Sequence, residues 1–302
     1  MRPLNIGRHV SMAYKLSICI PTYNRIACLK STLGQICSMV EKDGYAEQIE
    51  VCVSDNGSDD GSWDFLENAS TQFSFLSIRR NQDNQGFGRN FWHAAKMAKG
   101  EYIFFTGDDD SFPSDALKTL IMHTDGSSGL VLFNSHPTYA FRGDLFTDSE
   151  AVSIESIQRY LECLGVFHGS FIGNLMFRRE VFLRHCNIGD AVFLSAYPHL
   201  FPVFRVIHEG SALFVNSRIS DPDDGVRSWR KMQPIYTSID LARIVKQEVI
   251  AHVDKSIGRK LKLELARSLP RAIWCRLKGE VSIDPLNPFQ SVRPSNILSI
   301  YR

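Results

Sequence analysis

The sequence Leu16–Arg25, LSICIPTYNR, contains the pattern that decides the fold. Its first five residues, Leu16–Ile20, are apolar in four positions and are typical of a buried strand. Pro21–Arg25 forms a polar turn out of this strand, and the helical spacing of apolar residues over Ala27–Val40 predicts a helix after the turn. The stretch therefore predicts one unit of strand, turn and helix.

The same unit recurs along the first half of the chain. Further strands are predicted at Ile49–Val53, Phe75–Ile78, Tyr102–Phe105 and Leu130–Phe133, and further helices near Asp59, at Gly86–Lys99 and after Ser114. This alternation predicts an α/β fold with a mostly parallel sheet covered by helices on both faces. Ligands bind at the carboxyl ends of strands in such sheets, so the polar turns at Pro21–Arg25, Asp55–Ser58 and Gly107–Asp110 should lie close together.

Beyond about residue 135 the pattern is less regular. It predicts a polar hairpin, a helix, a strand, a helix, a strand and a loop, at Pro137–Asp148, Ile154–Leu164, Phe171–Phe177, Phe193–Val206, Leu213–Ile219 and Asp221–Arg227. The remainder, to about Arg276, is basic and helical, and the tail is rich in proline. We expect a catalytic domain over residues 1–220 and a helical C-terminal region over residues 221–302.

Composition excludes several classes of protein. The 302 residues are 44% apolar, which suits one large domain or a domain with an appendage. The net charge of +1 does not favour a nucleic acid partner. Seven cysteines without a CxxC pair indicate buried thiols in a reducing compartment. The chain shows no signal peptide and no apolar window of ~20 residues, so we expect a cytoplasmic protein that is soluble or peripheral to a membrane.

Three consecutive carboxylates, Asp108, Asp109 and Asp110, follow the strand Tyr102–Phe105. Two unit charges 4 Å apart repel by ~4 kcal/mol at an effective dielectric constant of 20, and a bound divalent cation removes that cost. Oxygen ligands on a cation that also holds phosphates are typical of Mg²⁺ or Mn²⁺. The alternative is that Asp109 or Asp110 caps the following helix while the other carboxylates are solvated.

Two other turns and one helix start carry polar groups that suit a nucleotide. Arg25 can meet a phosphate or an acidic group, and Asp55 can accept a hydrogen bond from a pyrimidine or a ribose hydroxyl. In Asn84–Asn90, NQGFGRN, two glycines stand at a helix start, and helix N-termini attract anions. Ordinary turn and N-cap chemistry would explain each segment alone, and the last one lacks the dinucleotide fingerprint.

Taken together, these segments resemble the family 2 glycosyltransferases, which are inverting enzymes of the GT-A fold. The resemblance runs through LSICIPTYNR, VCVSDNGSDDGSWDFL and NQGFGRNFWHAAKMAKGEYIFFTGDDD and covers roughly residues 15–125, with four motifs in the family's order and spacing. The segments SDNGSDD, GDDD and FIGNLMFRREVF, followed by SAYPHLFPVF, are most similar to the abequosyltransferase-like branch, which builds bacterial O-antigen.

The resemblance implies a donor site on named residues. The nucleotide pocket would be lined by Pro21, Thr22 and Asn24 or Arg25, with Asp55 hydrogen-bonded to the base. The ribose and the donor sugar would be bounded by Asn84, Arg89 and Asn90. Asp108 and Asp110 match the DxD motif, with Asp110 the more direct metal ligand and Asp109 beside the substrate. The cation, Mn²⁺ or Mg²⁺, would stabilise the departing nucleoside diphosphate as a Lewis acid.

The general base is the point at which the sequence departs from the family. Most members carry an acidic pair in the second half, whereas Ala196–His199 stands at that place here. His199 is the candidate base or substrate contact, with Asp190 and His168 in reserve. The alternative for His199 is a satisfied histidine on a partly apolar helix.

The segment Asp221–Trp229 could close over the donor, with Arg227 on the diphosphate and Trp229 on a sugar face. The alternative is a solvated acidic turn before a helix. The basic stretch Lys255–Lys278 could lie on an anionic membrane if the saccharide acceptor is lipid-linked, or it could be a solvated helix face over a core stripe.

Two other functions remain open. The chain could be a catalytically inactive protein that binds nucleotide sugars, because the acidic pair is missing. It could also be a nucleotidyltransferase, which uses a Gly-Asp-Asp turn between two antiparallel strands, but Pro113–Met122 has a helical pattern and a basic template channel is not indicated.

Overall fold

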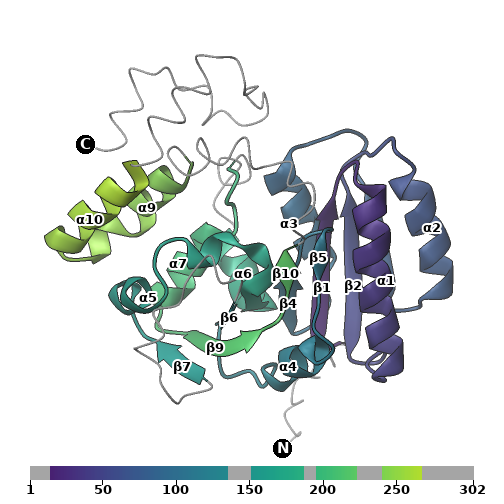
Figure 1. The fold of residues 1–302 in the computed structure, drawn as a ribbon, viewed down its shortest axis with the longest axis horizontal. Helices are drawn as coiled ribbons and strands as arrows, with labels where there is room; N and C mark the ends of the chain where they lie inside the picture. Colours follow the sequence, from purple (N-terminus) through teal and green to yellow (C-terminus); the bar gives the residue numbers. More distant parts are fainter. Residues whose placement is uncertain (1–13, 135–150, 187–194, 223–239, 267–302) are drawn as a thin grey trace, which may run out of the picture.

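The computed structural model describes residues 14–134, 151–186, 195–222 and 240–266. The parallel part of the sheet consists of four strands, and three helices connect or follow them; all of these elements lie on one side of the molecule (Figure 1). The strands are β1 (Leu16–Thr22), β2 (Ile49–Asp55), β3 (Leu76–Arg80) and β4 (Tyr102–Phe105). The helices are α1 (Ile26–Lys42), α2 (Ser62–Gln72) and α3 (Phe87–Met97). The predicted α/β fold is therefore confirmed.

Strands β1 and β2 lie side by side in the order β3-β2-β1-β4, and all seven residues of each are buried. A strand buried on both faces needs a nearly continuous apolar run, which the sequence supplies. In the register of this pair, Thr22 lies opposite Asp55, and Asp55 lies opposite Arg80 of β3. The strands therefore end level, and their turns leave the sheet at the same edge.

The second half of the sheet is mixed. Strand β8 (Leu175–Arg178) lies between β4 and β6 (Leu130–Asn134) and is antiparallel to both. Beyond β6 come β9 (Ala212–Arg218), which is parallel to β6, and the edge strand β7 (Ala151–Ile154), which is antiparallel to β9. The complete order of eight strands is β3-β2-β1-β4-β8-β6-β9-β7.

Helices cover both faces of this sheet. One core lies under α1, α2 and α4 (Ala116–Met122) and the other under α3, α6 (Arg179–Cys186) and α7 (Leu200–His208). Successive side chains of a strand point to opposite faces, and β4 shows this directly: Tyr102 and Phe104 join the first core, whereas Ile103 and Phe105 join the second. A further helix on the second face, α5 (Ile157–Cys163), begins where the Ser156 hydroxyl accepts a hydrogen bond from Arg159 N.

Several predicted elements differ in detail from the structure. The first part of the predicted strand Phe171–Phe177 is a 3-10 turn, Ile172–Asn174, which follows another at His168–Ser170. The predicted helix Phe193–Val206 begins only at Leu200. The predicted hairpin Pro137–Asp148 lies outside the described residues, as does the chain from residue 267 onward.

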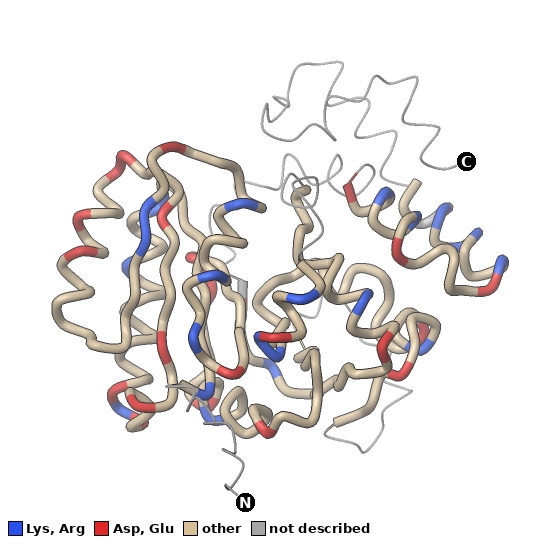
Figure 2. Tube along the Cα trace, turned by 180° about the vertical axis from the view of Figure 1, so that it is seen from behind, with Lys and Arg blue, Asp and Glu red and all other residues tan. Residues whose placement is uncertain are grey.

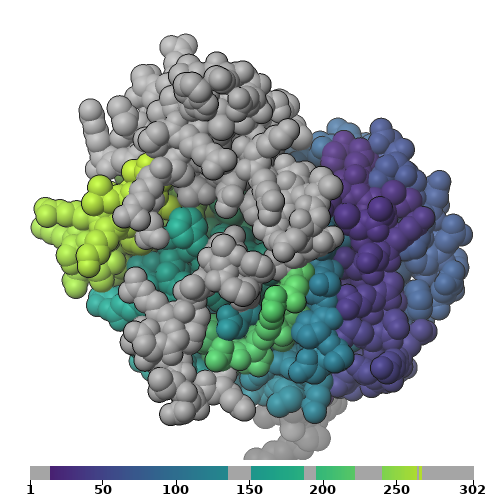
Figure 3. All heavy atoms as spheres, in the orientation of Figure 1, coloured from purple at the N-terminus to yellow at the C-terminus, as the bar shows by residue number. Residues whose placement is uncertain are grey.

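Two described helices follow the sheet, α9 (Ala242–Glu248) and α10 (Lys255–Ala266), with a 3-10 turn at Ile250–His252 between them. They lie on the side of the molecule opposite α1 and α2 (Figures 1 and 3). Leu241, Val245, Leu261 and Leu265 join the core beneath α7. The division of the chain at residue 221 stays a prediction.

The cysteines and the apolar character of the helices were both considered in the sequence analysis. All six described cysteines are free, and five of them are buried: Cys19, Cys37, Cys52, Cys163 and Cys186. Within the described ranges, no helix combines the length and the apolar character that crossing a bilayer requires.

Candidate functional site

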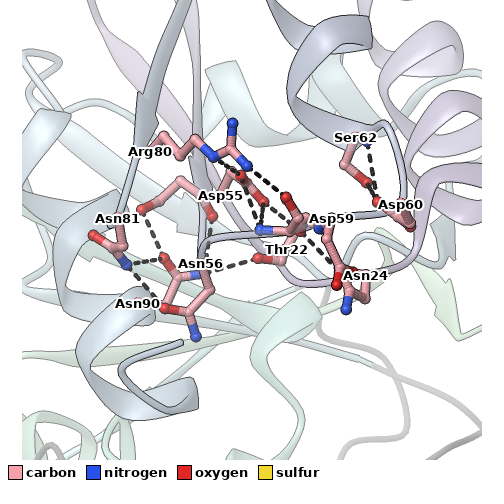
Figure 4. A network of polar contacts seen from close by, with 12 residues as sticks. Thr22, Asn24, Asp55, Asn56, Asp59, Asp60, Ser62, Arg80, Asn81 and Asn90 are labelled. Carbon is pink, nitrogen blue, oxygen red and sulfur yellow. Dashed lines mark hydrogen bonds and ion pairs between the residues drawn. The ribbon is translucent and has the colours of Figure 1, made fainter. Parts of the chain in front are cut away.

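The turns after β1 and β2 are tied to each other by hydrogen bonds. Asn24 N donates to Ser58 Oγ at 2.9 Å, and Asn24 Oδ1 accepts from Asp59 N at 2.9 Å. Asn24 adopts a φ of 50°, in the left-handed region that asparagine tolerates better than most residues. The Asn56 backbone N–H donates to Thr22 O at 3.0 Å. The two predicted turns therefore form one surface, much of which is shown in Figure 4.

Asp60 fixes the starts of both neighbouring helices. Its Oδ2 accepts from Ile26 N, the first residue of α1, at 2.8 Å. Its Oδ1 accepts from Ser62 N at 3.0 Å and from Ser62 Oγ at 2.6 Å, where α2 begins (Figure 4). One carboxylate thus satisfies N–H groups that helix starts leave unpaired.

The turn after β4 reaches the same surface through Asp108. Thr22 Oγ1 donates to Asp108 Oδ2 at 2.7 Å, and Arg25 Nη1 lies 2.7 Å from Asp108 Oδ1. Asp108 is 3% exposed, and burial raises its pKa to about 6 although the Arg25 charge opposes that rise. The prediction that the three polar turns lie close together is confirmed. We call the surface formed by residues 22–25, 55–60 and 106–110 the turn edge.

The other two aspartates of this turn have different surroundings. Asp109 Oδ2 lies 2.6 Å from Arg25 Nη2. Asp110 Oδ2 faces back into its own turn, where it accepts from Gly107 N at 2.8 Å and from Thr106 Oγ1 at 2.9 Å. Burial, followed by the Asp109 charge, raises the pKa of Asp110 to about 7.

Backbone contacts hold Asp110 in place from two sides. Thr32 Oγ1 of α1 donates to Asp110 O at 2.8 Å. Strand β5 (Asp110–Ser111) pairs antiparallel with β10 (Asp221–Pro222), the last described residues before the gap at 223. The chain that follows β9 therefore passes directly beside the aspartates.

Asp55 ends β2 and is fully buried. Its carboxylate accepts from Ser58 N at 3.3 Å and from the Ser58 hydroxyl, and Arg80 Nε lies 3.4 Å from its Oδ2. Arg80 also donates to Ser58 O at 2.6 Å, and its side chain is 40% exposed. In this arrangement Asp55 stabilises the turn, and its predicted bond to a nucleotide base stays a prediction.

Four asparagines form a network between the ends of β1, β2 and β3 and the start of α3. Asn90, which is 2% exposed, donates from Nδ2 to Thr22 O and Ser54 O and accepts on Oδ1 from Ser54 Oγ and from Asn81 Nδ2. Asn81 Nδ2 also donates to Asn56 Oδ1 at 2.9 Å (Figure 4). Asn56 Nδ2 then donates to Asn84 Oδ1 at 2.8 Å. The network attaches the start of α3 to the turn edge.

The sequence pattern of the family described as glycosyl transferase family 2 matches residues 17–185, which is more than half of the chain and contains every turn described above. The chain belongs to glycosyl transferase family 2. Among curated proteins, the abequosyltransferase RfbV of Salmonella typhimurium is 30% identical over 216 residues, 66% of this chain and 62% of that protein. The chain thus spans less than two thirds of that relative's length.

A second relative and two solved structures extend the comparison. The GalNAc(5)-diNAcBac-PP-undecaprenol beta-1,3-glucosyltransferase of Campylobacter jejuni is 26% identical over 255 residues, 80% of this chain and 77% of that protein. TarS of S. aureus (residues 1–349, with UDP-GlcNAc) is similar with a TM-score of 0.62 at 17% identity, over 95% of this chain and 80% of that one. A mannosyltransferase of Pyrobaculum calidifontis with GDP-Man and Mn²⁺ gives 0.60 at 17% identity, over 99% and 89%. These similarities identify the fold as GT-A.

In this family 2 chain, the carboxylates after β4 have the chemistry of a hard-cation site, since they already bind a positively charged group. The Arg25 guanidinium bridges Asp108 and Asp109, and carboxylate oxygens are the ligands that Mg²⁺ and Mn²⁺ prefer. Among the described residues, no group of three His, Cys, Asp or Glu side chains is arranged to hold a metal ion. Further ligands would be donor phosphates and water, as is usual for Mg²⁺. Direct ligation by Asp110 stays a prediction, because its Oδ2 is engaged within the turn.

The other predicted donor contacts lie around the turn edge at different depths. Pro21 is buried within β1, whereas Asn24 and Asn84 are exposed and Arg89 is half-buried. Asn90 lies beneath the surface and uses its side chain on protein groups. Their predicted contacts with substrate stay predictions. Asp190, Arg227 and Trp229 lie outside the described residues.

His199, the predicted base of the family 2 chain, lies in the core beside α3. It is 1% exposed, its ring centroid is 5.9 Å from that of Phe91, and Nε2 donates to Ser170 O at 3.1 Å. Burial lowers its pKa to about 4, so the ring is neutral at pH 7 with its lone pair on Nδ1. The reserve candidate His168 is equally buried, and burial also lowers its pKa to about 4. A catalytic role for either ring stays a prediction, and both rings contribute to packing in this structure.

Sequence reasoning missed Asn56, Asn81, Ser58 and Arg80. Asn81 directly follows β3, so the rule that placed functional groups at strand ends could have singled it out. Asn56 and Ser58 belong to the quoted turn SDNGSDD, but nothing in the sequence assigned them partners. Arg80 lies in a strand, and its pairing with Asp55 depends on the register of β2 and β3.

Proposed function

We propose that this family 2 chain is a glycosyltransferase that moves a sugar from a nucleoside-diphosphate sugar to an acceptor hydroxyl, with inversion at the anomeric carbon. The observation that carries the proposal is the meeting of Thr22, Arg25 and Asp108 at the turn edge. Three strand ends there combine carboxylates, a guanidinium and hydroxyls within hydrogen-bonding distance. A nucleoside diphosphate needs this set of donors and charges, and α/β sheets bind ligands at such edges.

Different residues of the described part would contact different parts of the donor. Asp55 and Asn84 stand on the side of β2 and α3, where a base and ribose would bind. Arg25 and Arg89 supply positive charge for the diphosphate. Asp108 and Asp109 would hold Mn²⁺ or Mg²⁺, which when bound stabilises negative charge on the leaving diphosphate. The Thr22 hydroxyl orients Asp108 by its bond to Oδ2.

The acceptor is inferred from the relatives. The Salmonella and Campylobacter proteins are named for transfer of abequose and for transfer to an undecaprenol-linked glycan. We therefore infer a saccharide acceptor of bacterial surface polysaccharide, as in O-antigen synthesis, carried on a lipid at the cytoplasmic face of the membrane.

The charge of α10 agrees with peripheral attachment to such a membrane. Figure 2 shows several Lys and Arg positions along this helix in blue. Its exposed basic residues include Lys255, Arg259 and Lys260, whereas Leu261 and Leu265 pack into the core. This pattern also fits the solvated helix face considered from the sequence, so membrane contact rests on the acceptor inference.

The general base is the open part of the mechanism. His199 would have to leave the core before it could take a proton from an acceptor hydroxyl. We therefore assign the role of general base to Asp190 or to another group. The nucleotidyltransferase alternative expects the aspartate turn to join two strands that pair with each other. Here β5 pairs with β10 and β4 pairs with β1 and β8, which disfavours that alternative.

The proposal is tested by binding before turnover. Thermal shift with UDP, GDP, CDP and dTDP, each with and without Mn²⁺, should identify one nucleotide that stabilises the protein only when Mn²⁺ is present. Asp108→Asn should remove that Mn²⁺-dependent shift, while the control Asp64→Asn on α2 should retain it, because Asp64 lies outside the turn edge.

Turnover then separates an active transferase from an inactive binding protein. Release of the identified nucleoside diphosphate from its sugar conjugate, with saccharide acceptors, should depend on Mn²⁺ or Mg²⁺. Binding without any turnover would favour the inactive alternative. The absence of binding to every nucleotide would refute the proposal.

A further inference from the structure

The Arg25 guanidinium spans two carboxylates of the aspartate turn. Nη1 lies 2.7 Å from Asp108 Oδ1, and Nη2 lies 2.6 Å from Asp109 Oδ2. Such short, charge-assisted contacts from one planar fork fix both carboxylates relative to each other. The aspartate turn therefore contains its own counter-cation.

The backbone on both sides of Arg25 is anchored, so an exchange of its partners would involve the side chain alone. Asn24 is held by two hydrogen bonds to the turn after β2, and Ile26 N donates to Asp60 Oδ2 at 2.8 Å. The Arg25 side chain itself is 25% exposed, more than the 5% of Asp108 or the 18% of Asp109. A long side chain on a fixed backbone, partly open to solvent, can exchange one partner for another without moving the fold.

The positions that Arg25 occupies are those that a divalent cation requires. Asp108 Oδ2 already accepts a hydrogen bond from Thr22 Oγ1, which makes Oδ1 the more available oxygen for a cation, and Arg25 Nη1 lies 2.7 Å from Oδ1. A metal ion and a guanidinium repel each other, so close contact of both with that oxygen is disfavoured. A donor diphosphate changes the balance, because its negative charge gives the displaced guanidinium a new bidentate partner.

We propose that Arg25 is a displaceable counter-cation, which competes with the divalent cation for Asp108 and Asp109 in the free protein and moves to the diphosphate when donor and cation bind together. The inference rests on the proposed function and adds to it a coupling between the binding of the cation and the binding of the donor. Bare metal binds weakly, and nucleotide and metal strengthen each other's binding. By linkage, the factor by which each ligand improves the affinity of the other is the same.

The test measures Mn²⁺ binding to the full chain without nucleotide, by the loss of the free-ion electron paramagnetic resonance signal and by calorimetry. Arg25→Gln removes the charge while keeping a polar side chain, and we expect it to bind Mn²⁺ more tightly than wild type by roughly 5- to 150-fold, the usual range of coupling between sites. Arg25→Lys keeps the charge but cannot bridge both carboxylates, so it should also gain affinity, by a smaller factor. The control Arg184→Gln removes an exposed arginine that pairs with Glu209 away from the turn edge, and it should match wild type.

A second measurement follows the coupling. The ratio of nucleoside diphosphate affinities with and without Mn²⁺ should be smaller in Arg25→Gln than in wild type, because the competition that nucleotide relieves has been removed. Arg25→Gln and Arg25→Lys with the Mn²⁺ affinity of wild type, or with a lower one, would overturn the inference, as would an unchanged ratio. The proposed function fails by a different result, a wild-type protein that binds no nucleoside diphosphate at all. If Arg25→Gln does not fold, the comparison of Arg25→Lys with wild type decides the matter.

Discussion

Replacing Asn90 by leucine tests whether the asparagine network supports the turn edge. Leucine has a similar volume, so the change leaves little cavity and removes mainly hydrogen bonds. The four bonds of the Asn90 side chain measure 2.8 and 3.2 Å from Nδ2 to Ser54 O and Thr22 O, and 2.7 and 3.1 Å to Oδ1 from Ser54 Oγ and Asn81 Nδ2.

The magnitude follows from which groups keep another partner. Thr22 O still accepts from Asn56 N at 3.0 Å, and Asn81 Nδ2 still donates to Asn56 Oδ1 at 2.9 Å. Ser54 O also keeps a partner, because the parallel pairing of β1 and β2 places the Thr22 N–H on it. The loss therefore falls mainly on the Ser54 hydroxyl. At about 1–3 kcal/mol for a buried group left without its bond, we expect the free energy of unfolding to fall by about 1–3 kcal/mol. That is a large part of a typical total of about 5–15 kcal/mol, yet it leaves the protein folded.

Urea unfolding followed by fluorescence measures this loss. The control is Asn68→Ala, which removes an exposed side chain that donates to Asp64 O and should change stability by no more than about 0.5 kcal/mol. Asn90→Leu should also weaken nucleoside diphosphate binding, because Thr22 and Ser54 end the strands that carry the turns. Stability and nucleotide affinity both equal to wild type would refute the supporting role of Asn90.

Three further predictions follow from other contacts. Burial lowers the pKa of His199 to about 4 from an ordinary 6.5, so the unfolded chain binds the proton first and stability falls as the pH drops from 6.5 toward 4. His199→Phe should flatten that part of the profile of unfolding free energy against pH by up to about 3 kcal/mol, and a profile parallel to wild type would contradict the buried assignment. Gly34→Ala, in the middle of α1 where an added Cβ would have no neighbour within 4 Å, should raise the free energy of unfolding by about 0.4–1 kcal/mol, as measured in urea. Gly100→Ala should lower it by about 1–3 kcal/mol in the same assay, because its Cβ would lie 2.8 Å from backbone atoms of β1; equal stability of the two variants would refute this steric argument.

The sequence by itself determined the parallel half of the sheet and the place of the turn edge. Short apolar runs buried on both faces predict parallel strands, and parallel strands with helical crossovers must end at one edge, so Thr22, Asp55 and Asp108 had to meet there. These are local patterns combined with a topological rule, and they need no knowledge of contacts between distant residues.

Tertiary structure decided what the sequence left open. The antiparallel strand β8 between β4 and β6, the burial of His199 and the inward side chain of Asn90 all depend on which elements pack together, which local periodicity does not encode. The pairing of Arg25 with Asp108 and Asp109 is of the same kind, because a charged side chain at a strand end has several possible partners until the fold brings one within reach. The sequence therefore determined that the polar side chains lie at one edge of the sheet. Tertiary packing determined which of them contact each other and which are buried.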